Sequence, residues 1–521
     1  MRKKTNKIVW LLVGLMGLMS FSACDFNLSG EESVVDDGVQ ILYENEETSS
    51  LGAGAQTDIP IAKEVGDKNY LTIKLINEVP LVGYIHYTDQ NDTSKTHKEK
   101  FFIEAGVGTF SMFLDGIRIG AFGAFEKRID RITLQNVDED TTGTVYVRKI
   151  SISDRTYDNQ EMLYLDNNML KVGASLAAGG ALCHLESLNR NVVEYIDKSG
   201  NVRIDEGIDP NTVNVVTDQV NLINVSDLGR EVQQSYYSNV TEANGYKPDD
   251  EVVYDSGFGY GYKYNPVQAG SAGDKQTQII DYELTEKRLY IKVRPQDWFF
   301  DNTQTDSYME STYTFDKTGA LIVTNRFINF AQFTNMGATW ASGQEIPAVY
   351  IVHPLNYFYC ETVEGVINDP GLSPIPSNDY KQSLSQTMEG NYWYQLPADT
   401  VVGDWLANVN DKGFGLGMYI PNVERYSASR GWKPTSYSIV YNNHYNNNIY
   451  DLRDLQYIPS MYVVNYNYFS PAVTRKMVDF VPFEYSFALY VGRVDEMRER
   501  FGWLKENGTI KNEGLDNWSK E

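Results

Sequence analysis

Short runs of alternating apolar and polar residues recur along most of the chain, and this pattern constrains the fold most. Successive side chains of a β-strand point to opposite sides, so alternation predicts strands with one buried face. Clear cases are residues 70–75, 289–294 and 484–491. Long runs with helical spacing are scarce, and Tyr (37 residues) and Gly (41 residues) are abundant. The sequence therefore predicts an all-β protein of antiparallel strands.

Strand spacing predicts two folded regions. Residues 58–155 combine short strands with Gly-rich connections, which is typical of a small β-sandwich or jelly roll and leaves open a carbohydrate-binding or a spacer role. Within it, Val145 and Val147 are expected to point inward, and a one-residue slip before Ile150 predicts a β-bulge. Residues 162–508 carry no clear Pro/Gly linker before about residue 490, which predicts one large antiparallel sandwich.

Helical spacing is clear only near the C-terminal end. In residues 494–505, the apolar side chains of Val494, Met497, Phe501 and Leu504 fall on one face of a helix. This segment is expected to be a packing helix and not a binding element.

The N-terminal residues carry the features of a secretory signal. Four Lys or Arg residues precede an apolar run at 8–19, and small residues lead to Cys24. Residues 1–23 are therefore predicted to be a signal peptide. The sequence SFSAC resembles a bacterial lipobox, which implies lipidation of Cys24. Residues 24–57 are acidic and polar and are predicted to be a flexible tether.

Acidic residues soon after the lipobox cysteine also resemble the export signals of surface lipoproteins of the Bacteroidota type. The expected location is the outer membrane, where the lipid holds the protein either at the cell surface or in the periplasmic leaflet. The membrane is expected as a partner through this anchor alone.

The net charge excludes some partner classes. Removing residues 1–23 takes away four positive charges, so the net charge goes from −25 to −29. Such a chain repels nucleic acid and anionic lipid, and neither is expected as a partner. The sequence has no CxxC pair and no Cys/His cluster, so no metal or other cofactor is expected. Cys183 and Cys360 are expected to form a disulfide or to remain buried thiols.

Residues 221–237, NLINVSDLGREVQQSYY, hold an unusual mixture of amide, charged and aromatic groups. Planar amides bind hydroxyl groups, and aromatic rings pack against the apolar face of a sugar. The predicted sugar contacts in this stretch are Arg230, Gln233, Gln234, Tyr236 and Tyr237. The alternative is a half-buried strand with one polar face.

Three later segments supply matching groups. Asn265 and Gln268 flank a proline turn rich in small residues, which lets a ligand approach the backbone closely. Gln344 and Glu345 stand at a polar-to-apolar transition in the third segment, residues 342–359. The fourth segment is residues 404–419. We predict Asn265, Gln268 and Gln344 as further sugar contacts.

The strings DLGREVQQSYY, YNPVQAG, GQEIPAVY and DWLANVNDKGFGLGMYIP, in this order, resemble the galactose-mutarotase-like supersandwich domain of secreted bacterial glycan-utilisation proteins. The segment YFSP…FEYSFALYVGRVDEMR is similar too. The resemblance covers about residues 165–505 and implies a two-sheet antiparallel sandwich whose concave face holds carbohydrate. Members include mutarotases and non-catalytic domains, so the fold does not settle the function.

Candidate catalytic groups follow from glycoside chemistry. Hydrolysis usually needs two carboxylates, and Glu345 is the candidate acid because burial would raise its pKa. Asp227 is a further carboxylate candidate. A mutarotase pairs a Glu with a His, and His353 is the candidate, although a core histidine is the alternative.

Two function classes stay open. One is a carbohydrate-active enzyme, for which a glycoside hydrolase is preferred to a polysaccharide lyase. The other is a non-catalytic surface glycan-binding protein. In both, a poly- or oligosaccharide is the partner, and other glycan-utilisation proteins are a further candidate class. A lyase would use Tyr236 or Tyr237 with Arg230 and Gln234 beside a uronate.

Overall fold

The computed structural model describes residues 38–45, 49–114, 127–188, 193–196, 202–205, 221–224, 228–238, 240, 246, 263–273, 275–300, 302–333, 341–352, 355, 357–369, 393–409, 413–430 and 466–520. The chain divides into two compact units, Met1–Gly38 and Val39–Glu521. The predicted signal peptide, Cys24 and the start of the predicted tether lie outside the described residues. No helix in the described ranges is long and apolar enough to cross a membrane.

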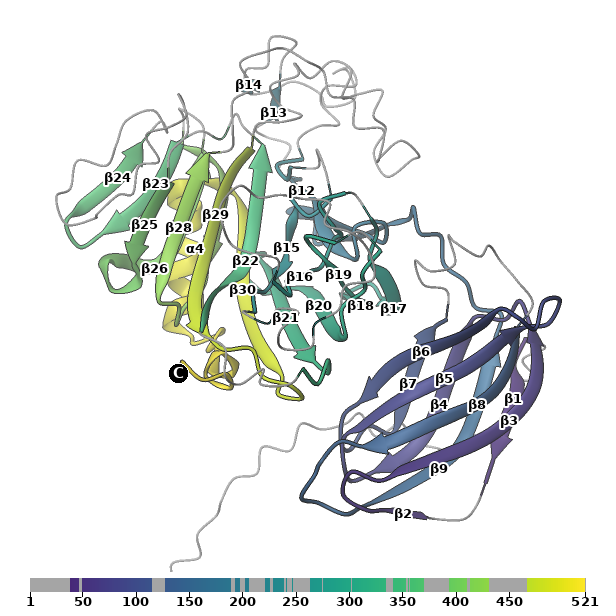
Figure 1. Cartoon of the computed structure of the whole chain (residues 1–521). Coiled ribbons are helices and arrows are strands. Elements are labelled where there is room, and N and C mark those ends of the chain that lie inside the picture. The colour runs from purple at the N-terminus through teal and green to yellow at the C-terminus, as the bar shows by residue number, and fades with distance from the viewer. Residues whose placement is uncertain are drawn as a thin grey trace, which may run out of the picture. The chain divides into compact units, whose positions relative to one another are not determined.

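The unit from Val39 begins with two antiparallel sheets (Figure 1). The five-stranded sheet runs β1-β9-β4-β7 with β2 beside β9, and the four-stranded sheet runs β3-β8-β5-β6. The strands are β1 (Gln40–Glu44), β2 (Ser49–Leu51), β3 (Gln56–Gly66), β4 (Tyr70–Asn77), β5 (Leu81–Asp89), β6 (Thr96–Ile103), β7 (Thr109–Phe113), β8 (Lys127–Asn136) and β9 (Gly143–Ser153). These sheets confirm the predicted β-structure of residues 58–155. The predicted flexible tether is wrong for residues 40–44 and 49–51, because β1 and β2 pair there with β9.

The predicted bulge in β9 is confirmed. Lys149 pairs with Lys74 of β4, whereas Val147 pairs with Leu75, so one extra residue of β9 lies between the two pairs. Val145 and Val147 are buried before the bulge, and Ile150 is buried after it. Val147 and Ile150 are three residues apart and would point to opposite faces of a regular strand. The extra residue of the bulge brings both side chains to the buried face.

Two larger sheets follow residue 160. The ten-stranded sheet contains β10 (Met162–Asp166), β11 (Leu170–Ser175), β12 (Ala181–Ser187), β15 (Val232–Ser235), β22 (Ser342–Val352), β29 (Tyr466–Arg475), β28 (Arg425–Arg430) and β25 (Trp393–Pro397), in this order. Beside β15 lies β16 (Pro266–Val267), and β19 (Gln296–Asp297) pairs with β16. The nine-stranded sheet contains β17 (Gln278–Leu284), β18 (Arg288–Arg294), β20 (Ser307–Phe315), β21 (Leu321–Asn329), β30 (Phe483–Arg493), β27 (Phe414–Tyr419), β26 (Val401–Val409), β23 (Tyr357–Thr362) and β24 (Gly365–Asp369). A separate hairpin joins β13 (Val193–Ile196) and β14 (Val202–Asp205).

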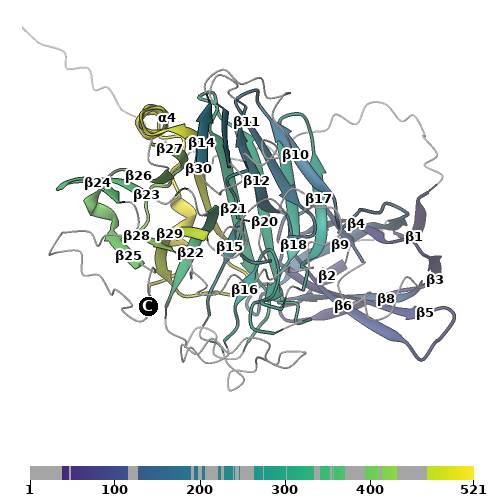
Figure 2. The ribbon, with the colours of Figure 1, turned by 90° about the horizontal axis from the view of Figure 1, so that it is seen from above.

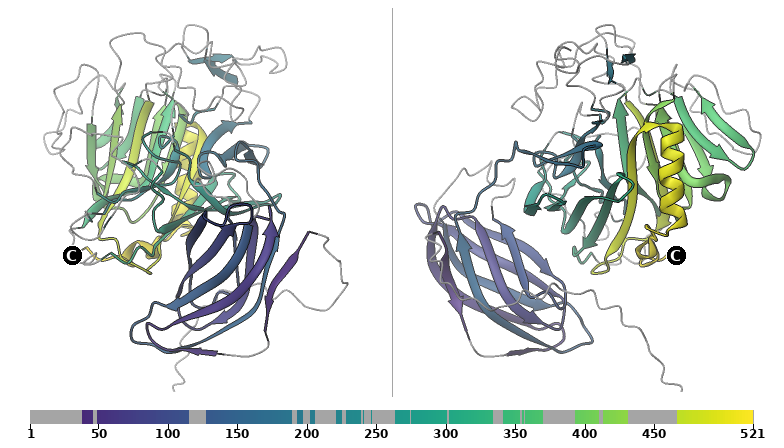
Figure 3. Two further views of the ribbon diagram at one scale, coloured as in Figure 1. Left: turned by 45° about the vertical axis from the view of Figure 1, so that its right-hand side comes forward. Right: turned by 180° about the vertical axis from the view of Figure 1, so that it is seen from behind.

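The two large sheets lie as adjacent layers, and α4 (Val494–Glu506) covers the far side of the nine-stranded sheet (Figures 2 and 3). The helix packs against β26, β27 and β30. Met497 and Phe501 lie so close to Gly417 that a side chain at this position would collide with them. Met497, Phe501 and Leu504 are fully buried, which confirms the predicted packing helix. Two 3-10 helices occupy Ala398–Thr400 and Glu513–Asp516.

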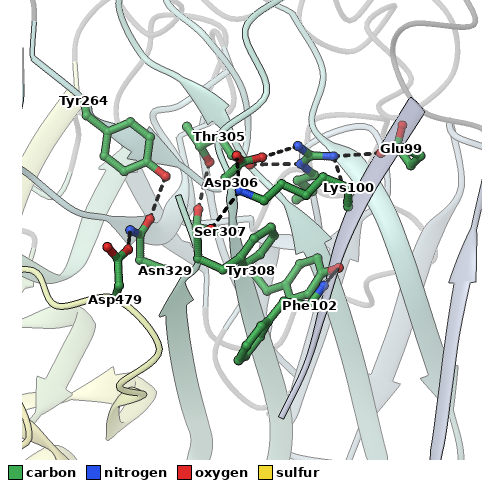
Figure 4. A network of polar contacts seen from close by, with 12 residues as sticks. Glu99, Lys100, Phe102, Tyr264, Thr305, Asp306, Ser307, Tyr308, Asn329 and Asp479 are labelled. Carbon is green, nitrogen blue, oxygen red and sulfur yellow. Dashed lines mark hydrogen bonds and ion pairs between the residues drawn. The ribbon is translucent and has the colours of Figure 1, made fainter. Parts of the chain in front are cut away.

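A buried charge network joins β6 to β18 and the start of β20 (Figure 4). Arg294 Nη1 lies 2.7 Å from Glu99 Oε1, and its Nη2 lies 2.5 Å from Asp306 Oδ1. Lys100 Nζ reaches the other oxygen of Asp306 at 2.8 Å. Burial alone would raise the pKa of Asp306, but Arg294 and Lys100 hold it below its ordinary value.

The predicted domain boundary near residues 155–162 stays a prediction, because both pairs of sheets belong to one compact unit. The apolar core of the first two sheets also includes Ile280, Tyr308 and Phe330 from the later strands. Cys183 and Cys360 are both buried and are not joined in a disulfide, so the buried-thiol alternative holds. Burial raises the pKa of the Cys360 thiol to about 12.

Candidate functional site

The ten-stranded sheet has one face toward the apolar core and one face away from it. Val232, Val349 and Phe469 form a row across β15, β22 and β29 and belong to the core. Ser235 is an odd number of residues from Val232, so its side chain points to the opposite face, and Glu345 pairs with it there. We call this opposite face the outer face.

Glu345 lies at the centre of a hydroxyl cluster on the outer face. The hydroxyl of Tyr237 donates to Oε2 at 3.1 Å, and the hydroxyl of Tyr468 donates to Oε1. Burial raises the pKa of Glu345, and bonds from Tyr468, Tyr237 and Ser235 oppose that rise, as does the charge of Arg425. The side chain is half-buried. The cluster therefore holds a carboxyl group that keeps its proton to a higher pH than a free glutamic acid.

One of the tyrosines that bond this carboxyl group, Tyr468, is part of an aromatic pair. Tyr350 and Tyr468 are directly paired across β22 and β29, and their ring centroids are 4.7 Å apart with planes tilted by 41°. Tyr468 is almost fully buried, whereas Tyr350 is half-buried. Aromatic surface beside hydroxyl and carboxyl groups is suited to a ligand that has both apolar and polar faces.

Gln344 has a structural role beside the cluster. Its Oε1 accepts from the backbone N–H of Tyr237 and its Nε2 donates to the C=O of Tyr237, both at 2.9 Å. Nε2 also donates to the C=O of Arg475 at 2.9 Å, and the side chain is fully buried. The amide thus takes the place of a strand partner where the β15–β22 pairing ends, and it fixes the backbone of Tyr237.

Gln234 and Tyr236 point into the space between the two large sheets. Tyr236 donates to Gln234 Oε1 at 2.8 Å, and Gln234 Nε2 donates to Ser311 Oγ at 3.1 Å. Ser311 donates to Asn325 Oδ1 at 2.9 Å, and Asn325 Nδ2 donates to the Tyr485 hydroxyl at 3.0 Å. The Tyr485 hydroxyl also lies near that of Tyr236, so these side chains form a closed polar ring.

Gln268 and Gln233 also bond within the protein. Gln268 Oε1 accepts from the N–H of Gln234 at 3.1 Å, and its Nε2 donates to the C=O of Gly179 at 3.1 Å. Gln233 Oε1 accepts from the N–H of Ala269 at 3.1 Å, and its Nε2 donates to the C=O of Gly229. Like these amides, the side chains of Gln234, Tyr236 and Gln344 are buried and bonded within the protein. Their role as sugar contacts stays a prediction.

Asn265 is buried next to an unusual carboxyl group. Its N–H donates to Asp297 Oδ2 at 3.0 Å, and the hydroxyl of Tyr246 donates to the same oxygen at 2.6 Å. The N–H of Phe299 donates to Asp297 Oδ1 at 2.9 Å. Burial nevertheless raises the pKa of Asp297 to about 7. Asn265 therefore belongs to a structural cluster around Asp297.

Arg230 lies apart from the Glu345 cluster. Its guanidinium carbon is 5.5 Å from the ring centroid of Trp298, and its C=O accepts from Asn224 Nδ2 at 2.9 Å. Asp227 and His353 lie outside the described residues. The predicted site residues that the structure brings together on the outer face are thus Glu345 and Tyr237.

Four residues of the cluster were missing from the prediction: Ser235, Tyr350, Arg425 and Tyr468. Ser235 stands between the predicted contacts Gln234 and Tyr236, and Tyr350 lies five residues after Glu345 in the third segment, residues 342–359. Arg425 and Tyr468 reach the cluster through the pairing of β22, β29 and β28, which no local pattern reveals. In the ranges that the structure describes, no group of three or more His, Cys, Asp or Glu side chains is placed to hold a metal ion.

No protein-family model and no curated protein matches this chain. Among solved structures, it is similar to a galactose mutarotase related enzyme from Lactobacillus acidophilus, with 11% identity over 64% of this chain and 97% of that chain and a TM-score of 0.31. A putative mutarotase from Salmonella typhimurium gives 10% identity over 65% and 92%, with a TM-score of 0.30. The 4-alpha-glucanotransferase of Thermococcus litoralis gives 8% over 65% and 38%, with a TM-score of 0.29.

These neighbours include mutarotase-related proteins, the group that the sequence resembles. The strands and their pairing establish an all-β protein of antiparallel sheets.

Proposed function

We propose that this chain binds a poly- or oligosaccharide on the outer face of the ten-stranded sheet, with Glu345 at the centre of the site. The observation that carries the proposal is the cluster itself: a half-buried carboxyl group held by the hydroxyls of Tyr237 and Tyr468, beside the ring pair Tyr350–Tyr468. A sugar offers hydroxyl groups to the carboxyl and phenol oxygens and an apolar face to the rings.

Glu345 is also suited to donate a proton. A general acid works best when its pKa lies near the working pH, and burial moves the pKa of Glu345 upward from that of a free glutamic acid. We therefore propose that Glu345 acts as the acid of a glycoside hydrolase. In this role its proton goes to the leaving oxygen of the glycosidic bond.

A non-catalytic glycan-binding protein is the second candidate, and one observation favours it. The groups that shift the pKa of Glu345 are three hydroxyls and the Arg425 guanidinium, and no second described carboxylate is among them. Hydrolysis with two carboxylates would need one close by. In this version the chain holds glycan for neighbouring glycan-utilisation proteins.

For the lyase alternative, the sequence predicted that Tyr236 or Tyr237 lies beside Arg230 and Gln234. The structure does not bring all of these side chains together. Tyr236 and Gln234 point between the sheets, whereas Tyr237 lies on the outer face. Arg230 is engaged by the ring of Trp298.

A glycan panel scored for both retention and product release tests the proposal. We expect the parent to retain at least one glycan, and Glu345→Gln to weaken retention or to abolish release. Glu361→Gln is a matched control, because Glu361 also accepts from a tyrosine hydroxyl (Tyr359, 3.1 Å) but lies on the nine-stranded sheet. Release that survives Glu345→Gln removes the acid role. Retention without release by the parent supports the binding candidate, and no retention of any glycan refutes the site.

We further propose that Cys24 carries a lipid and holds the protein in the outer membrane. The charged start, the apolar run and the SFSAC sequence support this. Cys24→Ala is expected to block incorporation of labelled palmitate and to release the protein from the membrane fraction. An unchanged membrane fraction without label would contradict the anchor.

A further inference from the structure

Arg425 lies on the same face of the ten-stranded sheet as Glu345. Glu345 pairs with Ala472 of β29, and Ala472 pairs with Arg425 of β28. Residues directly opposite each other in a sheet project from the same face. Two strand spacings separate the backbones of Glu345 and Arg425, or about 10 Å. The small side chain of Ala472 stands between them.

The guanidinium of Arg425 has a space made for it by a glycine. A Cβ placed on Gly343 would lie 2.2 Å from Nη2 of Arg425, so any side chain there would displace the guanidinium. Nη1 donates to the hydroxyl of Thr474 at 3.2 Å. The arginine is thus held over β22 by a neutral partner, and most of its N–H donors are left for other groups.

Arg425 has no carboxylate within ion-pair distance in the part of the chain that the structure describes, although the chain holds 70 acidic and 45 basic residues. Nearby acidic groups serve other cations. Glu424 Oε1 lies 2.7 Å from Arg475 Nη1 and 2.8 Å from Lys520 Nζ. The charge of Arg425 acts on Glu345 across the sheet, but a half-buried guanidinium without a direct ion pair has lost hydration for little return, and a bound anion would supply a direct partner.

We infer that Arg425 binds the carboxylate of a uronic acid, so that the saccharide taken by the Glu345 site is an acidic one. The inference rests on the proposed saccharide site and names its substrate class. Arg425 is suited to a carboxylate because its planar fork of N–H groups matches the two oxygens. A local cation of this kind also lets a chain of net charge −25 accept an anionic glycan that its overall charge would repel.

The test compares uronic-acid oligosaccharides with their carboxyl-reduced forms, in which each carboxylate is converted to a hydroxymethyl group. Binding to the full chain is measured by calorimetry. The parent is expected to bind at least one uronate at least tenfold more tightly than its reduced form. Arg425→Gln is expected to bring this ratio to within twofold of one, because the affinity for the uronate falls much further than the affinity for the reduced form. Arg425→Lys, which keeps the charge without the fork, is expected to keep part of the ratio.

Arg288→Gln is the control, because Arg288 is paired with Glu283 on the nine-stranded sheet. It should leave the ratio as in the parent. Equal binding of both forms by the parent overturns the inference, while binding of the reduced forms that depends on Glu345 keeps the proposed function. Equal loss of both forms in Arg425→Gln, or an Arg425-dependent preference for sulfated neutral saccharides without uronate binding, also overturns it. If neither form binds, the inference and the proposed function fall together.

Discussion

The hydroxyl of Tyr237 lies 3.1 Å from Oε2 of Glu345, although the two residues are 108 positions apart in the chain. Their contact depends on the pairing of Ser235 with Glu345 and on the side chain of Gln344, which bonds both backbone groups of Tyr237. The phenol is therefore held against the carboxyl group by the sheet itself.

Removing this hydroxyl is expected to raise the pKa of Glu345. The bond from Tyr237 favours the ionised carboxylate, so its loss in Tyr237→Phe leaves burial less opposed. Titration of carbon-13-labelled glutamate by NMR measures the change directly. If the chain turns over a glycan, the limb of the pH profile that reports this acid should move to higher pH.

Tyr359→Phe is the matched control, because Tyr359 bonds to Glu361 on the nine-stranded sheet. It should leave the titration of Glu345 unchanged. A Glu345 titration that is the same in Tyr237→Phe and in the parent would show that the hydrogen bond does not influence the carboxyl group.

The polar ring behind the site is expected to contribute several kcal/mol to stability. Asn325 accepts from Ser311 and donates to Tyr485 inside the sandwich, so Asn325→Ala leaves two buried groups without that partner. Each buried group left unpaired costs about 1–3 kcal/mol, so the free energy of unfolding should fall by about 2–4 kcal/mol. Urea denaturation measures this fall.

Thr324 provides the comparison for Asn325. It is the adjacent residue on the other face of β21, half-buried, with its hydroxyl 2.8 Å from that of Ser486. Thr324→Ala should cost less than about 1.5 kcal/mol, the net value of an ordinary hydrogen bond. Equal costs for the two variants would mean that the ring adds nothing beyond a surface contact.

The sequence predicts the strands of this protein well where one face of a sheet is buried against apolar residues. Residues 289–294 alternate as expected, with Leu289, Ile291 and Val293 fully buried in β18. The helix at the C-terminal end was predicted on the same ground, since its apolar residues face the nine-stranded sheet.

The run of residues 233–237, QQSYY, shows where such prediction ends. Both faces of this run hold polar and aromatic groups, so alternation does not tell which face is buried. Gln234 and Tyr236 point inward because Ser311, on another sheet and 77 positions from Gln234, accepts the amide of Gln234. Tyr468 is likewise 123 positions from Glu345. Only strand pairing brings these groups together.

The stability of the protein is expected to fall as the pH rises from about 4 to about 7, because Asp297 is buried as a carboxyl group. Its pKa is raised to about 7 in the folded protein, against 3.8 in the ordinary state. Between these values the folded state holds a proton that the unfolded state has released, so unfolding becomes easier as the pH rises. Below pH 4 and above pH 7 this contribution is constant.

Asp297→Asn should remove this pH-dependence, because the amide does not titrate. One pKa unit corresponds to about 1.4 kcal/mol, so the loss in the parent between pH 4 and pH 7.5 should reach a few kcal/mol by denaturant unfolding. Glu345, Asp281 and Asp479 also have raised pKa values and act with the same sign. The measurement is therefore made in a Glu345→Gln background with and without Asp297→Asn, and the difference between the two curves reports Asp297. Curves that fall equally in both backgrounds would assign the pH-dependence to other groups. A smaller fall in the presence of Asp297→Asn assigns the difference to the carboxyl group that Tyr246 and the N–H groups of Asn265 and Phe299 surround.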